Sequence, residues 1–241
     1  MSPSLSSPRI AIIGAGIIGL SCAWELAKRG AHVTLFDSGF YPGRGASWAA
    51  AGMLAPAYEA AAEPGVNPRL FDLCLKSARQ WIDMSGAIAA VTRRDVLHSI
   101  GPSLAVAQTA EDRIQLAGLA KALTARKIAF DVLSPDEAVQ AEPCLRVGNK
   151  GALRLPTDGQ VDNRLLVEAL IRALESQERV AFVTGTAPLA LVQGKIVLDG
   201  FDRVIFAAGW ETASVTVGEV PLGDIAPMLR KIEPVAGHML S

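Results

Sequence analysis

The chain has 241 residues, of which 50% are hydrophobic and 20% are charged, and its formal net charge is −1. This length and composition are typical of a globular protein with a sizeable core. A charge so close to zero, without a basic run, indicates no nucleic-acid-binding surface. The three cysteines are an odd number spread along the chain, which argues against a disulfide framework and favours a reducing compartment, so we expect a cytoplasmic protein.

The N-terminal region contains an apolar stretch that superficially resembles a signal peptide. Only Arg9 precedes this stretch as a charge, no small-residue cleavage site follows it, and residues 10–24 are too few to span a membrane. We therefore expect neither a leader nor a membrane span. Residues 1–8 are rich in serine and proline and are predicted to be a disordered lead-in.

Residues 9–19 predict a strand, a tight turn and the start of a helix. An apolar run leads into Gly14-x-Gly16-x-x-Gly19, and residues 20–29 continue with the composition of a helix. In such a motif the first glycine permits the turn, the second lets the backbone approach a pyrophosphate, and the third lets the helix pack closely on the strand. The N–H groups at the helix start, supported by the helix dipole, can then bind phosphates. The stretch predicts a dinucleotide site.

A second strand is predicted over residues 32–36, and it ends in Asp37. An acidic residue about 20 positions after the glycine motif accepts hydrogen bonds from ribose hydroxyls in dinucleotide-binding folds. We expect Asp37 to have this role. The alternative is a strand–helix–strand unit that binds no dinucleotide.

Residues 43–54, GRGASWAAAGML, are the second informative stretch. Ser47 is predicted to cap a short helix whose N–H groups face the same pyrophosphate. The small residues 49–52 permit a flat ring system to lie against the backbone. Composition alone is equally compatible with a close-packed or flexible helix that has no functional role.

The middle of the chain predicts structural elements without evident chemistry. Residues 68–90 have helical spacing, and the side chains on one side of this helix are expected to pack in the core: Leu70, Leu73, Ser77 and Trp81. Residues 96–100 and 104–107 read as a hairpin around Gly101 and Pro102. Ser134, followed by proline and then by Glu137, predicts a capped helix start.

The later part of the chain returns to the pattern of a parallel sheet. A strand is expected over residues 180–184, and a hairpin over residues 187–198. A buried strand then begins at Val204 and ends in small residues, which brings backbone to the carboxyl edge of the sheet, where ligands bind in doubly wound folds. Asp162 is expected to cap the helix that starts at Asn163.

Taken together, these residues resemble the FAD-dependent amino-acid oxidases of the D-amino-acid oxidase superfamily, and within it the glycine oxidases of thiamine biosynthesis. The matching stretches are Ile13–Gly19, Gly43–Leu54, Asp162 at the head of its helix, Val204–Trp210, and Pro234-Val235-x-Gly237. The resemblance implies an α/β fold, with a Rossmann-like FAD-binding domain of the GR2-type flavoproteins and an inserted, incomplete α+β substrate domain. It assigns residues 9–83 and 151–217 to the first domain, and residues 84–150 and 218–241 to the second.

The resemblance also implies a set of FAD-binding residues. The glycine motif with Ile17 and Ile18 would hold the pyrophosphate, and Asp37 the adenosine ribose. The remaining residues would contact the pyrophosphate and ribityl region (Arg44, Ala46, Ser47), the flavin ring (Gly52, Met53), the adenine (Leu189) and the back of the dinucleotide (Ala208, Gly209).

The implied reaction is oxidation of the amine of glycine or another small amino acid, with O₂ reduced to H₂O₂. Whole members of the family continue beyond this length and carry their substrate-binding arginine and tyrosine there, so we assign no catalytic residue, and no metal site is expected. A second chain that supplies the missing part, or a homo-oligomer, is the expected partner. Two alternatives stay open: an FAD-binding remnant or half-enzyme without activity alone, and an NAD-dependent dehydrogenase.

Overall fold

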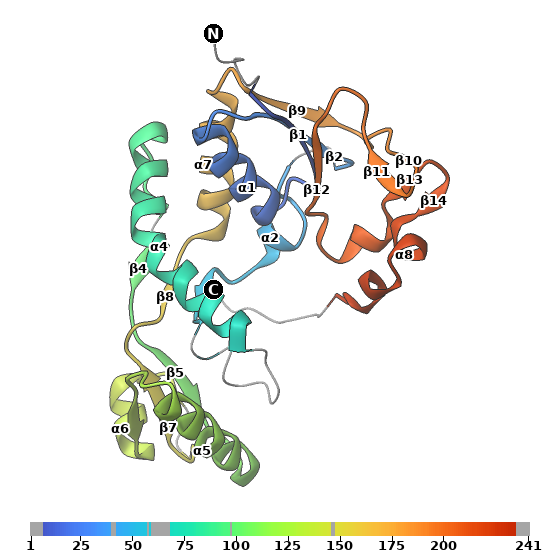
Figure 1. The fold of residues 1–241 in the computed structure, drawn as a ribbon. Coiled ribbons are helices and arrows are strands. Elements are labelled where there is room, and N and C mark those ends of the chain that lie inside the picture. Colours follow the sequence, from blue (N-terminus) through green and yellow to red (C-terminus); the bar gives the residue numbers. More distant parts are fainter. Residues whose placement is uncertain are drawn as a thin grey trace. The chain divides into compact units, whose positions relative to one another are not determined.

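The computed structural model describes residues 7–39, 42–56, 58, 68–96, 98–145 and 148–234 (Figure 1). Most of the predicted lead-in, and Val235 and Gly237 of the last motif, lie outside the described residues. The chain forms two compact units. Unit 1 comprises residues 1–51, 88–94 and 163–241, and unit 2 comprises residues 52–87 and 95–162.

Unit 1 is built on a four-stranded sheet with the order β12-β1-β2-β9. All its neighbouring strands are parallel. The strands are β1 (Arg9–Ile13), β2 (His32–Asp37), β9 (Val180–Thr184) and β12 (Arg203–Phe206). This parallel sheet confirms the predicted α/β class, because each of these strands falls where the apolar runs of the sequence predict one.

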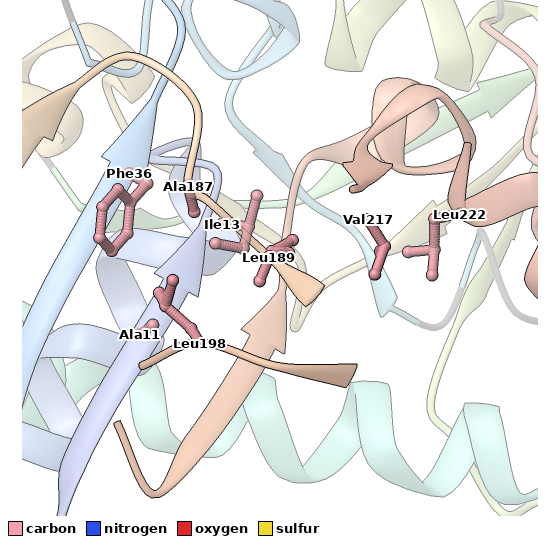
Figure 2. Close-up of a cluster of buried hydrophobic side chains, with 8 residues drawn as sticks. All are labelled: Ala11, Ile13, Phe36, Ala187, Leu189, Leu198, Val217 and Leu222. Carbon is pink, nitrogen blue, oxygen red and sulfur yellow. The ribbon is translucent and has the colours of Figure 1, made fainter. Parts of the chain in front are cut away.

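Two helices cover one face of this sheet, α1 (Ile17–Lys28) and α7 (Asn163–Glu175) (Figure 1). Side chains alternate along a strand, so Ile12 of β1 faces the helix layer, where its Cγ2 lies close to Gly19. The neighbours of Ile12 in the sequence face the other way. They join the buried cluster of Figure 2, which consists of Ala11, Ile13, Phe36, Ala187, Leu189, Leu198, Val217 and Leu222.

Short elements cover this second face. The predicted hairpin is confirmed as β10 (Ala190–Val192) and β11 (Lys195–Val197), with Gln193 and Gly194 at positive φ in the turn between them. The chain then forms the short elements η1 (Gly209–Ser214), β13 (Thr216–Val217), β14 (Val220–Pro221), α8 (Leu222–Ile225) and η2 (Pro227–Lys231). Their apolar side chains complete the core on this side of the sheet.

Unit 2 contains two three-stranded antiparallel sheets. One has the order β3-β8-β4 and the other β5-β7-β6. Their bounds are β3 (Met53–Leu54), β8 (Gly159–Gln160), β4 (Ser99–Ile100), β5 (Ser103–Val106), β7 (Ala152–Leu155) and β6 (Asp131–Leu133). The helices α5 (Ala110–Ala125) and α6 (Pro135–Ala141) accompany the second sheet.

The predicted hairpin around Gly101 and Pro102 is wrong. β4 pairs with β8, whereas β5 pairs with β7, so the two strands enter different sheets. The Gly101 N–H donates to the Asp158 carbonyl instead of closing a hairpin, and proline at position 102 has no N–H to donate.

The predicted core stripe of the long helix is also wrong. The helix itself is confirmed as α4 (Pro68–Thr92). However, the side chains of Leu70 and Leu73 are 50% and 62% exposed, whereas Phe71 and Ile88 are buried. The predicted stripe is therefore not the buried one, because the partners that cover a helix are distant in sequence and local spacing does not identify them. No helix among the described residues is both long enough and apolar enough to cross a membrane.

Candidate dinucleotide-binding site

The turn between β1 and α1 is locked against the end of β12. Gly14 has φ +105°, and a Cβ built there would lie 2.5 Å from the carbonyl oxygen of Ala207. The Ala207 N–H in turn donates to the Ile13 carbonyl at 2.7 Å. A Cβ at Gly19 would overlap the Gly14 carbonyl oxygen. The fold itself therefore requires glycine at positions 14 and 19.

The fold does not require glycine at position 16. Its φ of −72° and ψ of −178° suit any residue, and a Cβ there would meet only the Ser47 hydroxyl, at 3.2 Å. Among the described residues, no acceptor is paired with the N–H groups of Gly16 and Ile18, which point out of the start of α1. Backbone donors at a helix N-terminus next to a side-chain-free position fit a pyrophosphate.

Ser47 completes this turn in a way that the sequence did not predict. It lies inside the short helix α2 (Ala46–Ala49), whose N-cap is Gly45. The expectation that Ser47 caps its own helix is therefore wrong. Its Oγ instead accepts the Ile17 N–H at 2.9 Å and so caps the first turn of α1.

Asp37 binds the backbone of the same turn. One carboxylate oxygen accepts the Ala15 N–H at 2.7 Å, and the other accepts the Gly39 N–H at 2.8 Å. Two carboxylate oxygens offer about four acceptor sites, so the half-buried group retains capacity for a ribose hydroxyl. The assignment of the ribose to Asp37 stays a prediction.

Arg44 lies beside Ser47 in sequence, and its guanidinium stacks over the Trp48 ring at 3.5 Å from the ring centroid. The Arg164 guanidinium approaches the same ring at 5.5 Å. Sequence reasoning did not single out Arg164 or its neighbour Asn163. The one sequence signal for these two residues was that they are polar and directly follow Asp162, the predicted helix cap.

The other predicted FAD-binding residues are distributed over both units. Ala46 is exposed at the start of α2, and the Ala208 backbone packs against Gly14. Gly209 has φ +59° and begins η1, while the Leu189 side chain is buried in the cluster of Figure 2.

Gly52 and Met53 belong to unit 2. The Gly52 carbonyl accepts the Val161 N–H at 2.9 Å, and the Met53 side chain, in β3, is 66% exposed. Their assignment to the flavin ring stays a prediction.

Among the described residues, the surroundings of the turn show neither an activated thiol nor a cluster of metal-ligating side chains. Burial raises the pKa of the Cys22 thiol in α1, which keeps it protonated. Within the described ranges, no three His, Cys, Asp or Glu side chains gather as a metal site would require. The site is one of backbone donors, hydroxyls and guanidinium groups, which can hold a dinucleotide but not carry out redox chemistry alone.

The sequence identifies the class to which this site belongs. Residues 9–241 match the DAO family of FAD dependent oxidoreductases, and the chain belongs to this family. FAD is thus the dinucleotide that this class of proteins binds, and the NAD-dependent alternative is excluded.

Individual relatives are similar over most of the chain. A D-amino acid dehydrogenase from Xanthobacter autotrophicus is 26% identical over an alignment of 284 positions, covering 97% of this chain and 66% of that protein. Among solved structures, glycine oxidase from Geobacillus kaustophilus has a TM-score of 0.77 and 28% identity, covering 87% of this chain and 58% of that one. Iminodiacetate oxidase from Chelativorans sp. BNC1 has a TM-score of 0.70 and 25% identity, covering 86% and 57%.

These matches confirm the predicted family, fold class and cofactor. They also show that the chain spans about two thirds of the curated relative and less than that of the two solved oxidases.

Proposed function

We propose that this chain is an FAD-dependent oxidoreductase that oxidises the amine of glycine or another small amino acid, in the cytoplasm and in connection with thiamine biosynthesis. The observation that carries the proposal is the turn at Gly16. Its backbone donors, its open Cβ position and the neighbouring Ser47 hydroxyl fit a pyrophosphate. The similarity to glycine oxidase supports the substrate class.

In this proposal each group of the turn has a defined task. The N–H groups of Gly16 and Ile18 bind the pyrophosphate, Arg44 offsets its charge, and Asp37 accepts a ribose hydroxyl. Oxidation of the amine to an imine, followed by reduction of O₂ to H₂O₂, is the chemistry that FAD supplies when bound. We assign no substrate-binding residue and propose that the substrate domain includes residues 84–150 and 218–241.

A second candidate function is an FAD-binding half-enzyme or remnant that has no activity alone and needs a second chain or copy. The exposed side chains of Leu70 and Leu73, which are neighbours on the surface of α4, favour it, because contiguous exposed apolar surface marks sites of association.

The visible absorption spectrum of the purified protein, recorded before and after anaerobic addition of glycine, tests both candidates. Flavin bands that bleach would support the oxidase. Bands that persist with glycine and with other small amino acids would support the half-enzyme. A protein without flavin bands, even after incubation with excess FAD, would contradict the proposed function.

A further inference from the structure

We infer that Asn163 is a positioning residue for the proposed FAD site, on whose existence this inference rests. Asn163 is the first residue of α7, and its Nδ2 donates to two consecutive carbonyls of α2, Ser47 at 2.8 Å and Trp48 at 3.0 Å. The neighbouring Arg164 donates from Nε to the Trp48 carbonyl at 3.4 Å. The start of α7 is thus hydrogen-bonded to the end of α2.

The short helix needs this support. α2 has four residues, and its own backbone bonds run from Trp48 and Ala49 back to Gly45. A helix of one turn is unstable by itself, because the bonds that it closes do not repay the ordering of its backbone. Its last carbonyls lack intrahelical donors and must be satisfied from outside. Asn163 provides the donor for two of them.

The helix that holds α2 in place, α7, is itself fixed in the core of unit 1. The side chains of Leu166 and Leu170 of α7 are buried in unit 1. A Cβ at Gly43, which has φ +74°, would overlap the Val167 side chain, so the backbone preceding α2 also lies directly on α7. Contacts at Gly43 and at Asn163 therefore fix the segment that carries Arg44 and Ser47.

Asn163 affects the position of groups at the glycine turn through Ser47. The carbonyl of Ser47 is held by Asn163, and its hydroxyl accepts the Ile17 N–H at the start of α1. Without Asn163 the backbone of α2 loses one of its supports, and the Ser47 hydroxyl no longer has a fixed place beside the proposed pyrophosphate. Asn163 would act on FAD affinity without contacting FAD.

A double-mutant cycle tests this route. FAD dissociation constants, from quenching of flavin fluorescence on titration, are measured for the wild type, Asn163→Ala, Ser47→Ala and the double variant. Loss of two hydrogen bonds predicts that Asn163→Ala weakens binding about tenfold. If Asn163 acts through Ser47, it will weaken binding much less in the Ser47→Ala background than in the wild type. Additive effects, or unchanged affinity in Asn163→Ala, would overturn the inference.

The variant Asn163→Asp adds a second measurement, the pH dependence of FAD affinity. A simple loss of packing at this position would not change with pH. An ionised carboxylate would face two carbonyl oxygens, and protonation would restore a donor. The FAD affinity of this variant should therefore rise as the pH falls from about 8 to about 5, relative to the wild type at each pH. A constant ratio of affinities would count against the inference even if the alanine variant does not fold.

Asn149→Asp in unit 2 is the matched control. Its Nδ2 also donates to a carbonyl, that of Pro135, and its side chain is buried. This variant should lose stability without a pH-dependent change in FAD affinity. A wild-type protein that binds no FAD would refute the proposed function itself, an outcome distinct from a wild type that binds FAD and is insensitive to position 163.

Discussion

Gly14, Gly16 and Gly19 belong to one motif, yet the structure surrounds them differently. Main-chain atoms crowd the first and the third, at Ala207 and at Gly14 respectively, whereas the second faces only a serine hydroxyl. Replacing the first or third should therefore damage the fold, while replacing the second should damage binding. Single substitutions can separate these two requirements.

We predict that Gly16→Val abolishes FAD binding and lowers the melting temperature much less than Gly14→Ala does, because the branched side chain occupies the approach to the backbone donors and meets only the Ser47 hydroxyl. Gly14→Ala should instead lower the melting temperature strongly, since it combines a positive φ with a contact of 2.5 Å. Thermal melts and FAD titrations of both variants test this, with Gly118→Ala in α5, where a Cβ meets nothing within 4 Å, as the control. Normal flavin content in Gly16→Val would refute the assigned pyrophosphate site.

At the scale of elements, two helices of unit 2, α5 and α6, begin at complete capping boxes. Ser134 Oγ accepts the Glu137 N–H at 3.3 Å, and the Glu137 carboxylate accepts the Ser134 N–H at 2.8 Å. Thr109 and Asp112 form the same arrangement at the start of α5. Hydrogen bonds from the backbone lower the pKa of both carboxyls, Glu137 through Ser134, and Asp112 through Gln108 and Thr109.

These caps predict a pH dependence of stability. Because folding lowers the pKa of Glu137 from its ordinary value of 4.5, its contribution is complete above that pH and is lost as the pH falls through the folded pKa. The gap in urea midpoint between wild type and Glu137→Ala should therefore be present near neutral pH and shrink in acid. Glu137→Gln, which cannot titrate, should keep a constant gap from the alanine variant. A wild-type gap that persists in acid would contradict this account.

The elements also show how far sequence reasoning reached. The order β1, α1, β2 could be predicted because its signals are local: an apolar run, glycines at fixed spacing and an acid at the strand end. The face of α4 and the partners of β4 and β5 could not, because burial and pairing depend on segments far away in sequence. In the site, Gly16 and Asp37 follow from the motif, whereas Asn163 becomes visible only once α7 is placed beside α2.

At the scale of the molecule, the described surface carries large exposed apolar side chains. On α4, Leu70, Leu73 and Ile82 are 50%, 62% and 59% exposed, and β9 and β12 form the edges of the parallel sheet. Apolar faces and open strand edges both promote association between chains. Such a surface agrees with the expectation that the chain associates with a second chain or with a copy of itself.

We predict that the purified chain is oligomeric or poorly soluble, and that Leu73→Lys increases the fraction of monomer. The lysine replaces one exposed apolar side chain of α4 with a charge, while its helix propensity stays close to that of leucine. Size-exclusion chromatography with light scattering measures the mass, and Lys76→Arg on the same helix serves as a control that leaves it unchanged. A monodisperse wild-type monomer with a cooperative melt would contradict the prediction.

The contact between Gly14 and Ala207 has a consequence for biosynthesis. The first β-strand and the glycine turn leave the ribosome early, but the strand and backbone that close the turn come from residues 203–208. Contacts between such distant positions form late, since the intervening chain must be made before they can close. The nascent chain therefore carries its glycine motif long before the turn is closed, and we expect it to retain FAD only after residues 203–208 have been made.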